Sequence, residues 1–92
     1  MKKCSRLTRA MLLVGAEVER ATQNFRPFNS THEGYAVILG ELDELWEEVR
    51  RKPSPERDKA LKAEAIQVAA MGVRFLMDVC LSHEDSKEAP HD

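Results

Sequence analysis

Apolar residues spaced alternately three and four positions apart recur in three runs along this chain of 92 residues. Such spacing places the apolar side chains on one face of an α-helix, because successive residues turn by about 100°. Pro27, Pro53 and Pro55 separate the runs, and proline disfavours helix at the preceding residue and supplies no amide donor. The pattern predicts an all-α fold with three long helices. They span residues 5–24, 31–51 and 55–81.

Helix-start signals agree with these bounds. Ser30 and Glu33 fit a capping box, in which each side chain satisfies the backbone amide of the other residue. Ser54 can cap the third helix, with Pro55 at its first position. Because the connection between the second and third helices is short, these two helices should pack antiparallel. The sequence therefore predicts an antiparallel helical bundle.

The chain is predicted to form one small domain over residues 1–82, followed by a mobile tail over residues 83–92. Hydrophobic residues make up 42% of the chain and charged residues 33%, a globular balance that argues against wholesale disorder. A chain this short buries a limited share of its surface, and its first and third helices carry more apolar residues than a three-helix monomer covers. We therefore expect a homo-oligomer, a dimer or a tetramer, that completes the core.

Charge and cysteine usage narrow the class of protein. The net charge is -2 with no basic excess, so a nucleic-acid partner is not expected. Cys4 and Cys80 form neither a metal-ligand pair nor a disulfide framework, which favours reduced thiols in the cytoplasm. Residues 1–16 resemble the start of a signal peptide, but their apolar run is short and Glu17 follows it directly. No apolar run approaches membrane-spanning length, so no membrane partner is expected.

Acidic residues border the apolar face of the second helix. Glu41, Glu44 and Glu48 share one border because they lie three or four positions apart. The corresponding border of the third helix carries Glu64 and Gln67. Each of these two helices therefore presents a pair of oxygen-bearing side chains at a spacing of three, and antiparallel packing lets the two pairs face each other.

Two interpretations of this border remain open. Carboxylates held close together repel one another unless a cation neutralises them, and Mg²⁺ prefers such oxygen ligands and retains waters that a phosphate can displace. Clustered acids also occur on plain solvated helix faces. The matched spacing on two consecutive helices favours a metal site, with Mg²⁺ as the expected ion and Mn²⁺ as an alternative.

The two acidic pairs resemble a known signature. The sequence "ELDE" at residues 41–44, followed in the next helix by "EAIQ" at residues 64–67, is similar to the ExxE…ExxD motif of the all-α nucleoside triphosphate pyrophosphohydrolases, which include the MazG-like proteins. The resemblance covers residues 29–80. It implies a magnesium-dependent cleavage of a nucleotide between its α- and β-phosphates, which releases a monophosphate and pyrophosphate.

The resemblance also implies roles for single residues. By position, Glu41, Glu44 and Glu64 match metal ligands of the family, and Gln67 stands where the family has aspartate. An amide oxygen can coordinate a metal but brings no charge. Either this protein binds the metal more weakly, or Glu48 contributes, or the activity has been lost. Glu44 and Glu48 are both candidates for the catalytic carboxylate that orients the attacking water.

Three further residues are candidates for substrate contacts. His32 lies in the first turn of the second helix, where backbone amides attract anions, so it either contacts a phosphate or is a plain surface histidine. Arg74, on the acid-bearing border of the third helix, either meets a phosphate or pairs with an acid. Phe28, in the first loop, either stacks on a base or closes the end of the bundle.

Two hypotheses of different class follow. The first is a homo-oligomeric, magnesium-dependent hydrolase that cleaves a nucleoside or deoxynucleoside triphosphate to the monophosphate and pyrophosphate. The second is a non-catalytic helical interaction protein that keeps the MazG-like fold, and Gln67 is the main reason to retain it. A small nucleic-acid-binding protein is disfavoured by the acidic balance of the chain.

Overall fold

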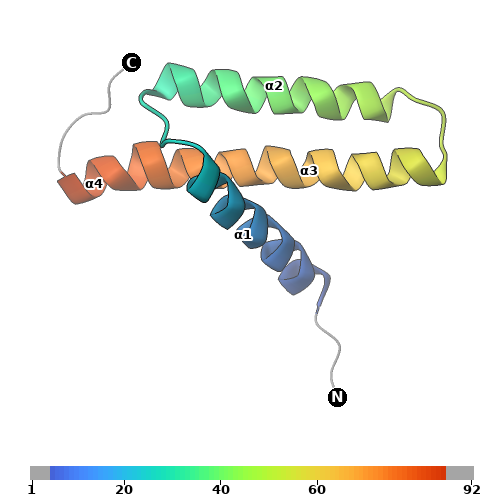
Figure 1. Ribbon diagram of the computed structural model, residues 1–92, viewed down its shortest axis with the longest axis horizontal. Coiled ribbons are helices and arrows are strands. Elements are labelled where there is room, and N and C mark those ends of the chain that lie inside the picture. Colours follow the sequence, from blue (N-terminus) through green and yellow to red (C-terminus); the bar gives the residue numbers. More distant parts are fainter. Residues whose placement is uncertain (1–4, 87–92) are drawn as a thin grey trace.

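The computed structural model describes residues 5–86 and shows the all-α fold that the sequence predicts. Figure 1 shows the second and third helices side by side and antiparallel, with the first helix crossing the third and then diverging from it. Among residues 5–86 there is no β-strand. The elements are α1 (Arg6–Asn24), α2 (Thr31–Val49) and α3 (Pro55–Phe75), which η1 (Leu76–Leu81) and α4 (Ser82–Ser86) continue.

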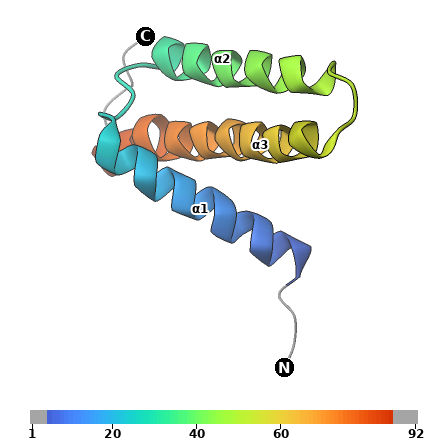
Figure 2. The same ribbon diagram turned by 45° about the vertical axis from the view of Figure 1, so that its right-hand side comes forward.

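Helix α3 is central to the fold. Both α2 and α1 pack against it, and Figure 2 shows them on different sides of α3. The core forms mainly where the C-terminal half of α1 meets α3. The N-terminal half of α1 diverges from α3, so Leu7 is 70% exposed and Met11 is 64% exposed. The buried apolar residues are Val18, Ala21, Phe28, Ala70, Met71 and Val79.

Serine residues cap the start of all three long helices. The hydroxyl oxygens of Ser5, Ser30 and Ser54 each accept a hydrogen bond of 3.0 Å from the backbone N–H three residues later. The capping box predicted at Ser30 is only half formed, because Oε1 of Glu33 accepts from the backbone N–H of Asn29, at 2.8 Å, instead of from Ser30. The carboxylate therefore satisfies an amide one residue earlier than predicted.

An arginine holds the turn between α2 and α3. Arg57, in the first turns of α3, donates from Nε to the carbonyl of Glu48 at 3.1 Å and from Nη2 to the carbonyl of Val49 at 2.8 Å. The last carbonyls of a helix lack intrahelical partners, and Arg57 supplies one to Val49 and adds a second to Glu48, whose carbonyl also accepts from the backbone N–H of Arg51 at 3.2 Å. The end of α2 is thereby tied to the start of α3, which fixes the antiparallel hairpin that carries the acids.

Glycine at position 34 allows α2 to approach α3 closely. Gly34 is buried, and a Cβ added there would overlap the ring of Phe75 and lie 3.2 Å from the ring of Phe28. The two aromatic rings occupy the space that a side chain would need. The junction between the first loop and the hairpin is therefore close-packed.

The third helix is longer than predicted. Because η1 and α4 continue it to Ser86, the helix reaches into the predicted tail as far as residue 86, and the rest of that tail, residues 87–92, lies outside the described part of the chain. The continuation begins with a π-helical segment, Leu76–Leu81, and the prediction placed the end of the helix at Leu81.

One helix, Pro55–Asp85, is long and apolar enough to cross a membrane by length and composition, with a mean hydropathy of 1.5 over its most apolar 18-residue window. The expectation that no segment reaches this length is therefore corrected. Arg74 and Asp78 interrupt the apolar run, so no uninterrupted apolar segment of the sequence reaches this length. The mean hydropathy over 18 residues stays high in spite of these two charged residues. The core helix of a soluble protein passes the same test, so the finding does not assign this helix to a membrane.

Candidate metal site

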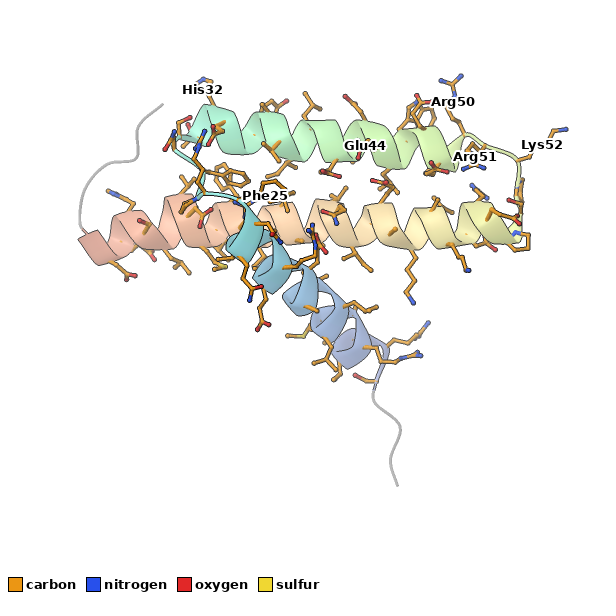
Figure 3. All side chains as sticks on the ribbon, viewed as in Figure 1. Phe25, His32, Glu44, Arg50, Arg51 and Lys52 are labelled. Carbon is orange, nitrogen blue, oxygen red and sulfur yellow. The ribbon has the colours of Figure 1, made fainter. Side chains whose placement is uncertain are left out.

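The acids predicted to bind metal converge between α2 and α3. Glu41 and Glu44 lie on α2 and Glu64 lies on α3, and one carboxylate oxygen from each lies within 4.8 Å of the other two. The antiparallel hairpin brings them together, because side chains three positions apart on each helix share the face that meets the other helix. In Figure 3, Glu44 lies on the side of α2 nearer to α3. These three residues are called the acidic cluster below.

The acidic cluster is electrostatically unsatisfied. Oε2 of Glu41 and Oε2 of Glu64 are buried atoms without a hydrogen-bond partner among residues 5–86. Burial raises the pKa of Glu41, and the neighbouring Glu44 carboxylate raises it further. Burial, followed by the charge of Glu44, likewise raises the pKa of Glu64. A divalent cation would stabilise this arrangement, because it supplies the positive charge that the acidic oxygens lack.

Glu48 and Gln67 lie beside the acidic cluster but are engaged elsewhere. Glu48 forms an ion pair with Arg51, although its charge still helps to raise the pKa of Glu64. Gln67 hydrogen-bonds to Glu17 of α1. In this structure the amide links α3 to α1, and the carboxylate of Glu48 already has a cationic partner.

Glu17 belongs to the surroundings of the site but was not predicted. Arg20 donates from Nε to Oε1 of Glu17 at 2.9 Å, and this bonding, followed by the hydrogen bond from Gln67, lowers the pKa of Glu17 to about 2. The negative charge of Glu17 contributes to the raised pKa of Glu41. The sequence did hold a signal, since Glu17 precedes Val18 at the border of an apolar stripe, as the acids of α2 do.

A cavity of about 560 Å³ opens beside the acidic cluster, between α1, α2 and α3. Glu41 and Glu44 line one end of it, and the other end is lined by aromatic rings and arginines that include Phe25, Phe28 and Arg74. Ligand pockets in proteins measure about 300–1,000 Å³. Two of the predicted metal ligands therefore face a space large enough for a small molecule.

At this far end of the cavity, Arg74 and Phe28 contact each other and bind neighbouring groups of the protein. The guanidinium of Arg74 lies 4.6 Å from the centroid of the Phe28 ring and donates from Nη2 to the carbonyl of Arg26 at 2.8 Å. Nη2 also lies 3.9 Å from Oδ2 of Asp78, which accepts from the backbone N–H of Phe28 at 3.1 Å. Arg74 is therefore paired with an acid, and the buried Phe28 closes this end of the bundle.

His32 lies apart from the cavity. It is exposed, it is not among the residues that line the cavity, and Figure 3 shows it on the outer side of α2. The next residue, Glu33, does line the cavity and binds Arg26 through hydrogen bonds of 3.0 and 2.8 Å. Phe25, which is 58% exposed, is the more accessible of the two aromatic rings in the cavity wall.

Comparisons with models of protein families, with curated proteins and with solved structures find no match to this chain. The resemblance to the pyrophosphohydrolases therefore depends on residues 41–44 and 64–67 and on the helical hairpin that carries them. The geometry itself offers three carboxylates from two helices, two buried oxygens without donors, and an adjoining cavity. Such an arrangement is suited to hold a divalent cation where a ligand in the cavity can reach it.

Proposed function

We propose that this protein is a magnesium-dependent nucleotide pyrophosphohydrolase, which cleaves a nucleoside or deoxynucleoside triphosphate to the monophosphate and pyrophosphate. The observation that carries the proposal is the acidic cluster, Glu41, Glu44 and Glu64, whose oxygens lie within 4.8 Å of one another beside a cavity. The resemblance of the two acidic pairs to the family motif supplies the reaction. Mn²⁺ is a second suitable ion, because it accepts the same oxygen ligands.

In this proposal the three residues of the acidic cluster hold the cation, since their hard carboxylate oxygens are the ligands that Mg²⁺ prefers. When bound, the ion neutralises phosphate charge and positions the reacting phosphate, which is most of what phosphoryl transfer requires. Gln67 has a supporting role, because its hydrogen bond to Glu17 ties α1 to the hairpin. The missing fourth carboxylate is expected to weaken the binding of the ion.

Glu44 is the residue proposed to orient the attacking water. Glu48 was the other candidate, but its carboxylate is engaged by Arg51. Glu44 is exposed and lines the cavity, so a water molecule in the cavity can reach its carboxylate. An oxygen that is not occupied by metal can accept the proton of that water.

The remainder of the cavity suits the rest of a nucleotide. Phe25 offers an exposed ring in the cavity wall, and base–aromatic stacking contributes about 1–3 kcal/mol per base. Arg20 and Arg26 add positive charge to the same wall, although each is paired with a glutamate. These groups favour a nucleotide without selecting one base.

A non-catalytic helical interaction protein of the same fold is the second candidate. Gln67 hydrogen-bonds to Glu17 instead of adding a fourth acid to the cluster. In addition, large apolar side chains are exposed on α1 and α2, among them Leu12 at 64% and Trp46 at 58%. Exposed apolar patches mark interaction surfaces.

The proposed location is the cytoplasm. Cys80 is a free and exposed thiol, and Cys4 lies outside the described residues. Unpaired thiols suit a reducing compartment.

The test of the proposed activity is pyrophosphate release from a panel of nucleoside and deoxynucleoside triphosphates with magnesium. We expect release from at least one nucleotide, and a loss of at least about 100-fold in Glu64→Gln, because even changes outside the first ligand shell cost about 10–100-fold. Glu47→Gln is the matched control. It makes the same chemical change at an exposed residue of α2 outside the acidic cluster, and it should keep the parental rate.

The outcomes separate the two candidates. If no nucleotide is cleaved while Mn²⁺ binds to the acidic cluster, the non-catalytic candidate is the correct one. If Glu41→Gln, Glu44→Gln and Glu64→Gln all hydrolyse nucleotides at the parental rate, the acidic cluster has no part in the reaction and the proposal is wrong.

A further inference from the structure

Three arginines of the described chain line the cavity, and they differ in the partners of their donors. Arg74 is 5% exposed and donates to the carbonyl of Arg26. Both Nη atoms of Arg26 donate to Glu33. Arg20 is different, because its Nε and Nη2 donate to Glu17, whereas its Nη1 has no hydrogen-bond partner among residues 5–86.

The guanidinium of Arg20 is accessible and held in one orientation. Its side chain is 53% exposed. Glu17, whose side chain is 14% exposed, binds the edge formed by Nε and Nη2. Arginine presents its donors in a planar fork that fits phosphate oxygens. A guanidinium that is already oriented loses less side-chain freedom when a second anion binds, so Nη1 is suited to accept a phosphate.

Gln67 holds the pair of Glu17 and Arg20 near the acidic cluster. Gln67 lies three residues after Glu64 on α3, lines the cavity and hydrogen-bonds to Glu17. The negative charge of Glu17 contributes to the raised pKa of Glu41, which is further evidence that the pair lies beside the cluster. An aspartate at position 67 would instead place a second carboxylate next to Glu17.

The order of residues along α1 matches the order of groups in a nucleotide. Arg20 lies one turn after Glu17, and Phe25 follows five residues later, roughly 7–8 Å further along the helix axis. The ring of Phe25 is 58% exposed in the cavity wall. A nucleotide whose phosphates reach the acidic cluster and whose base stacks on Phe25 therefore passes Arg20.

The site also needs a positive group besides the metal. Three ionised carboxylates outweigh one divalent cation, so the acidic cluster and a bound Mg²⁺ together bring no positive charge to the phosphates. In phosphoryl transfer, arginine or lysine side chains commonly supply positive charge where negative charge develops in the transition state. Nη1 of Arg20 offers donors for this purpose, whereas the Nη atoms of Arg26 are engaged by Glu33.

We propose that Arg20 binds the phosphate chain of the substrate through Nη1, and that Gln67, acting through Glu17, positions it. The inference rests on the proposed function, because it assigns the phosphate end of the same substrate. Arg20 and Glu17 lie outside residues 29–80, which the resemblance covers, so the assignment comes from the contacts of α1. Gln67 has a role that an aspartate cannot perform, because its amide donates to the carboxylate of Glu17.

Calorimetric titration of the full chain with α,β-methylene analogues of the common nucleoside triphosphates, in magnesium, tests the contact without turnover. Arg20→Gln should raise the dissociation constant at least about tenfold, because a hydrogen bond between two charged groups is lost. Arg9→Gln is the matched control, since Arg9 is exposed on α1 and does not line the cavity, and it should keep the parental value. Mn²⁺ binding to Arg20→Gln should be no weaker than in the parent. Circular dichroism checks that the variants remain helical.

A double-mutant cycle tests the positioning role of Gln67. Gln67→Met removes the amide and keeps an unbranched side chain of good helix propensity, and it should weaken binding of the analogue several-fold. When Arg20→Gln is already present, Gln67→Met should have no further effect, because Gln67 acts through that guanidinium. Gln67→Asp should bind Mn²⁺ at least as tightly as the parent and the analogue more weakly, because its carboxylate repels Glu17.

The outcomes separate this inference from the proposed function. If triphosphates are cleaved but Arg20→Gln binds the analogue as tightly as the parent, the proposed function stands and the inference is wrong. If no triphosphate is cleaved but Arg20→Gln weakens binding of the analogue, the reaction is wrong and the phosphate contact stands. Effects of Arg20→Gln and Gln67→Met that multiply, or tighter binding of the analogue in Gln67→Asp, would overturn the positioning role. A parent that binds none of the analogues would overturn the whole inference.

Discussion

The two ends of the cavity both carry glutamates, but only one end provides them with partners. At the arginine end, Glu33 binds Arg26 through two hydrogen bonds, and this partner lowers the pKa of Glu33. At the acidic end, Glu41 and Glu64 each keep a buried oxygen without a partner, and burial raises the pKa of both. The same type of side chain is therefore stabilised in its charged form at one end and destabilised at the other.

This difference separates a structural acid from a candidate ligand. A glutamate with its own arginine is already neutralised, and a cation gains little by approaching it. A glutamate that burial and helix packing hold near other acids, without donors, can offer its charge to a cation. Glu33 and Glu41 both line the cavity, so their partners, and not their location, distinguish them.

The largest effect is expected at the arginine end. Arg74→Met removes a guanidinium that is 5% exposed and leaves the carbonyl of Arg26 and the carboxylate of Asp78 without it. Breaking a buried polar contact of this kind costs about 3 kcal/mol of the free energy of unfolding. Urea denaturation measures the loss. Arg50→Met, at an exposed ion pair, should cost less than about 1 kcal/mol, and equal losses in the two variants would contradict the comparison.

Magnesium is expected to have the next largest effect, through the acidic end alone. A cation that binds only the folded state contributes about 2.7 kcal/mol at one hundred times its dissociation constant, and each kcal/mol raises the melting temperature of a small domain by roughly 4–8 °C. Thermal melts in millimolar magnesium and in chelator measure the difference, which Glu41→Gln should reduce and Glu33→Gln should preserve. Melts of the parent that coincide in the two buffers would count against the site.

Glutamate-to-glutamine substitutions at the two ends of the cavity should have smaller effects on the melting temperature in chelator, and the two effects should have opposite signs. Glu64→Gln removes a charge that burial and Glu44 disfavour, so the melting temperature should rise by a few degrees. Glu33→Gln removes the partner of Arg26, so the melting temperature should fall. A fall in both variants would mean that the acidic cluster is not under repulsion.

The smallest effect is a dependence of stability on pH in chelator. The raised pKa of Glu41 and of Glu64 favours their protonated forms in the folded state, so their stabilising contribution is present below the ordinary value of 4.5 and is lost as pH rises through the raised values. Glu17 acts in the opposite sense, because its pKa of about 2 gives a contribution that is lost as pH falls from 4.5 toward 2.

Stability in chelator should therefore decline as pH rises from 4.5, because Glu41 and Glu64 lose their stabilising protons there. Urea denaturation at a series of pH values measures the decline. The double variant Glu41→Gln, Glu64→Gln should show a flatter profile than the parent. Superimposable profiles would show that these two groups do not titrate abnormally.

The three long helices could be predicted from the sequence, because the spacing of apolar residues, the prolines and the serine caps act within a few residues of the chain. The acidic cluster was predictable for the same reason, since the short turn after α2 requires α2 and α3 to pack antiparallel. The link between Gln67 and Glu17 was not predictable, because it depends on where α1 crosses α3. The pairing of Arg26 with Glu33 across the first loop is likewise set by the path of the loop.

The helix end was missed for another reason. A break in apolar periodicity after Leu81 predicted a tail, but helix α4 carries on to Ser86, with Ser82, Glu84 and Asp85 exposed. Periodicity reports a face that packs against other elements, and a solvated continuation of a helix has no such face.

The central claim is tested most directly by the binding of Mn²⁺ to the parent and to matched variants. Electron paramagnetic resonance of the free ion measures this binding. The claim is that Glu41, Glu44 and Glu64 hold a divalent cation, because Glu41 and Glu64 each keep a buried oxygen without a partner among residues 5–86. We predict one site in the parent, displaced by excess Mg²⁺, lost or at least about tenfold weaker in Glu64→Gln, and unchanged in Glu33→Gln and Glu47→Gln. Absence of binding to the parent, or equal binding to Glu64→Gln and the parent, would contradict the account.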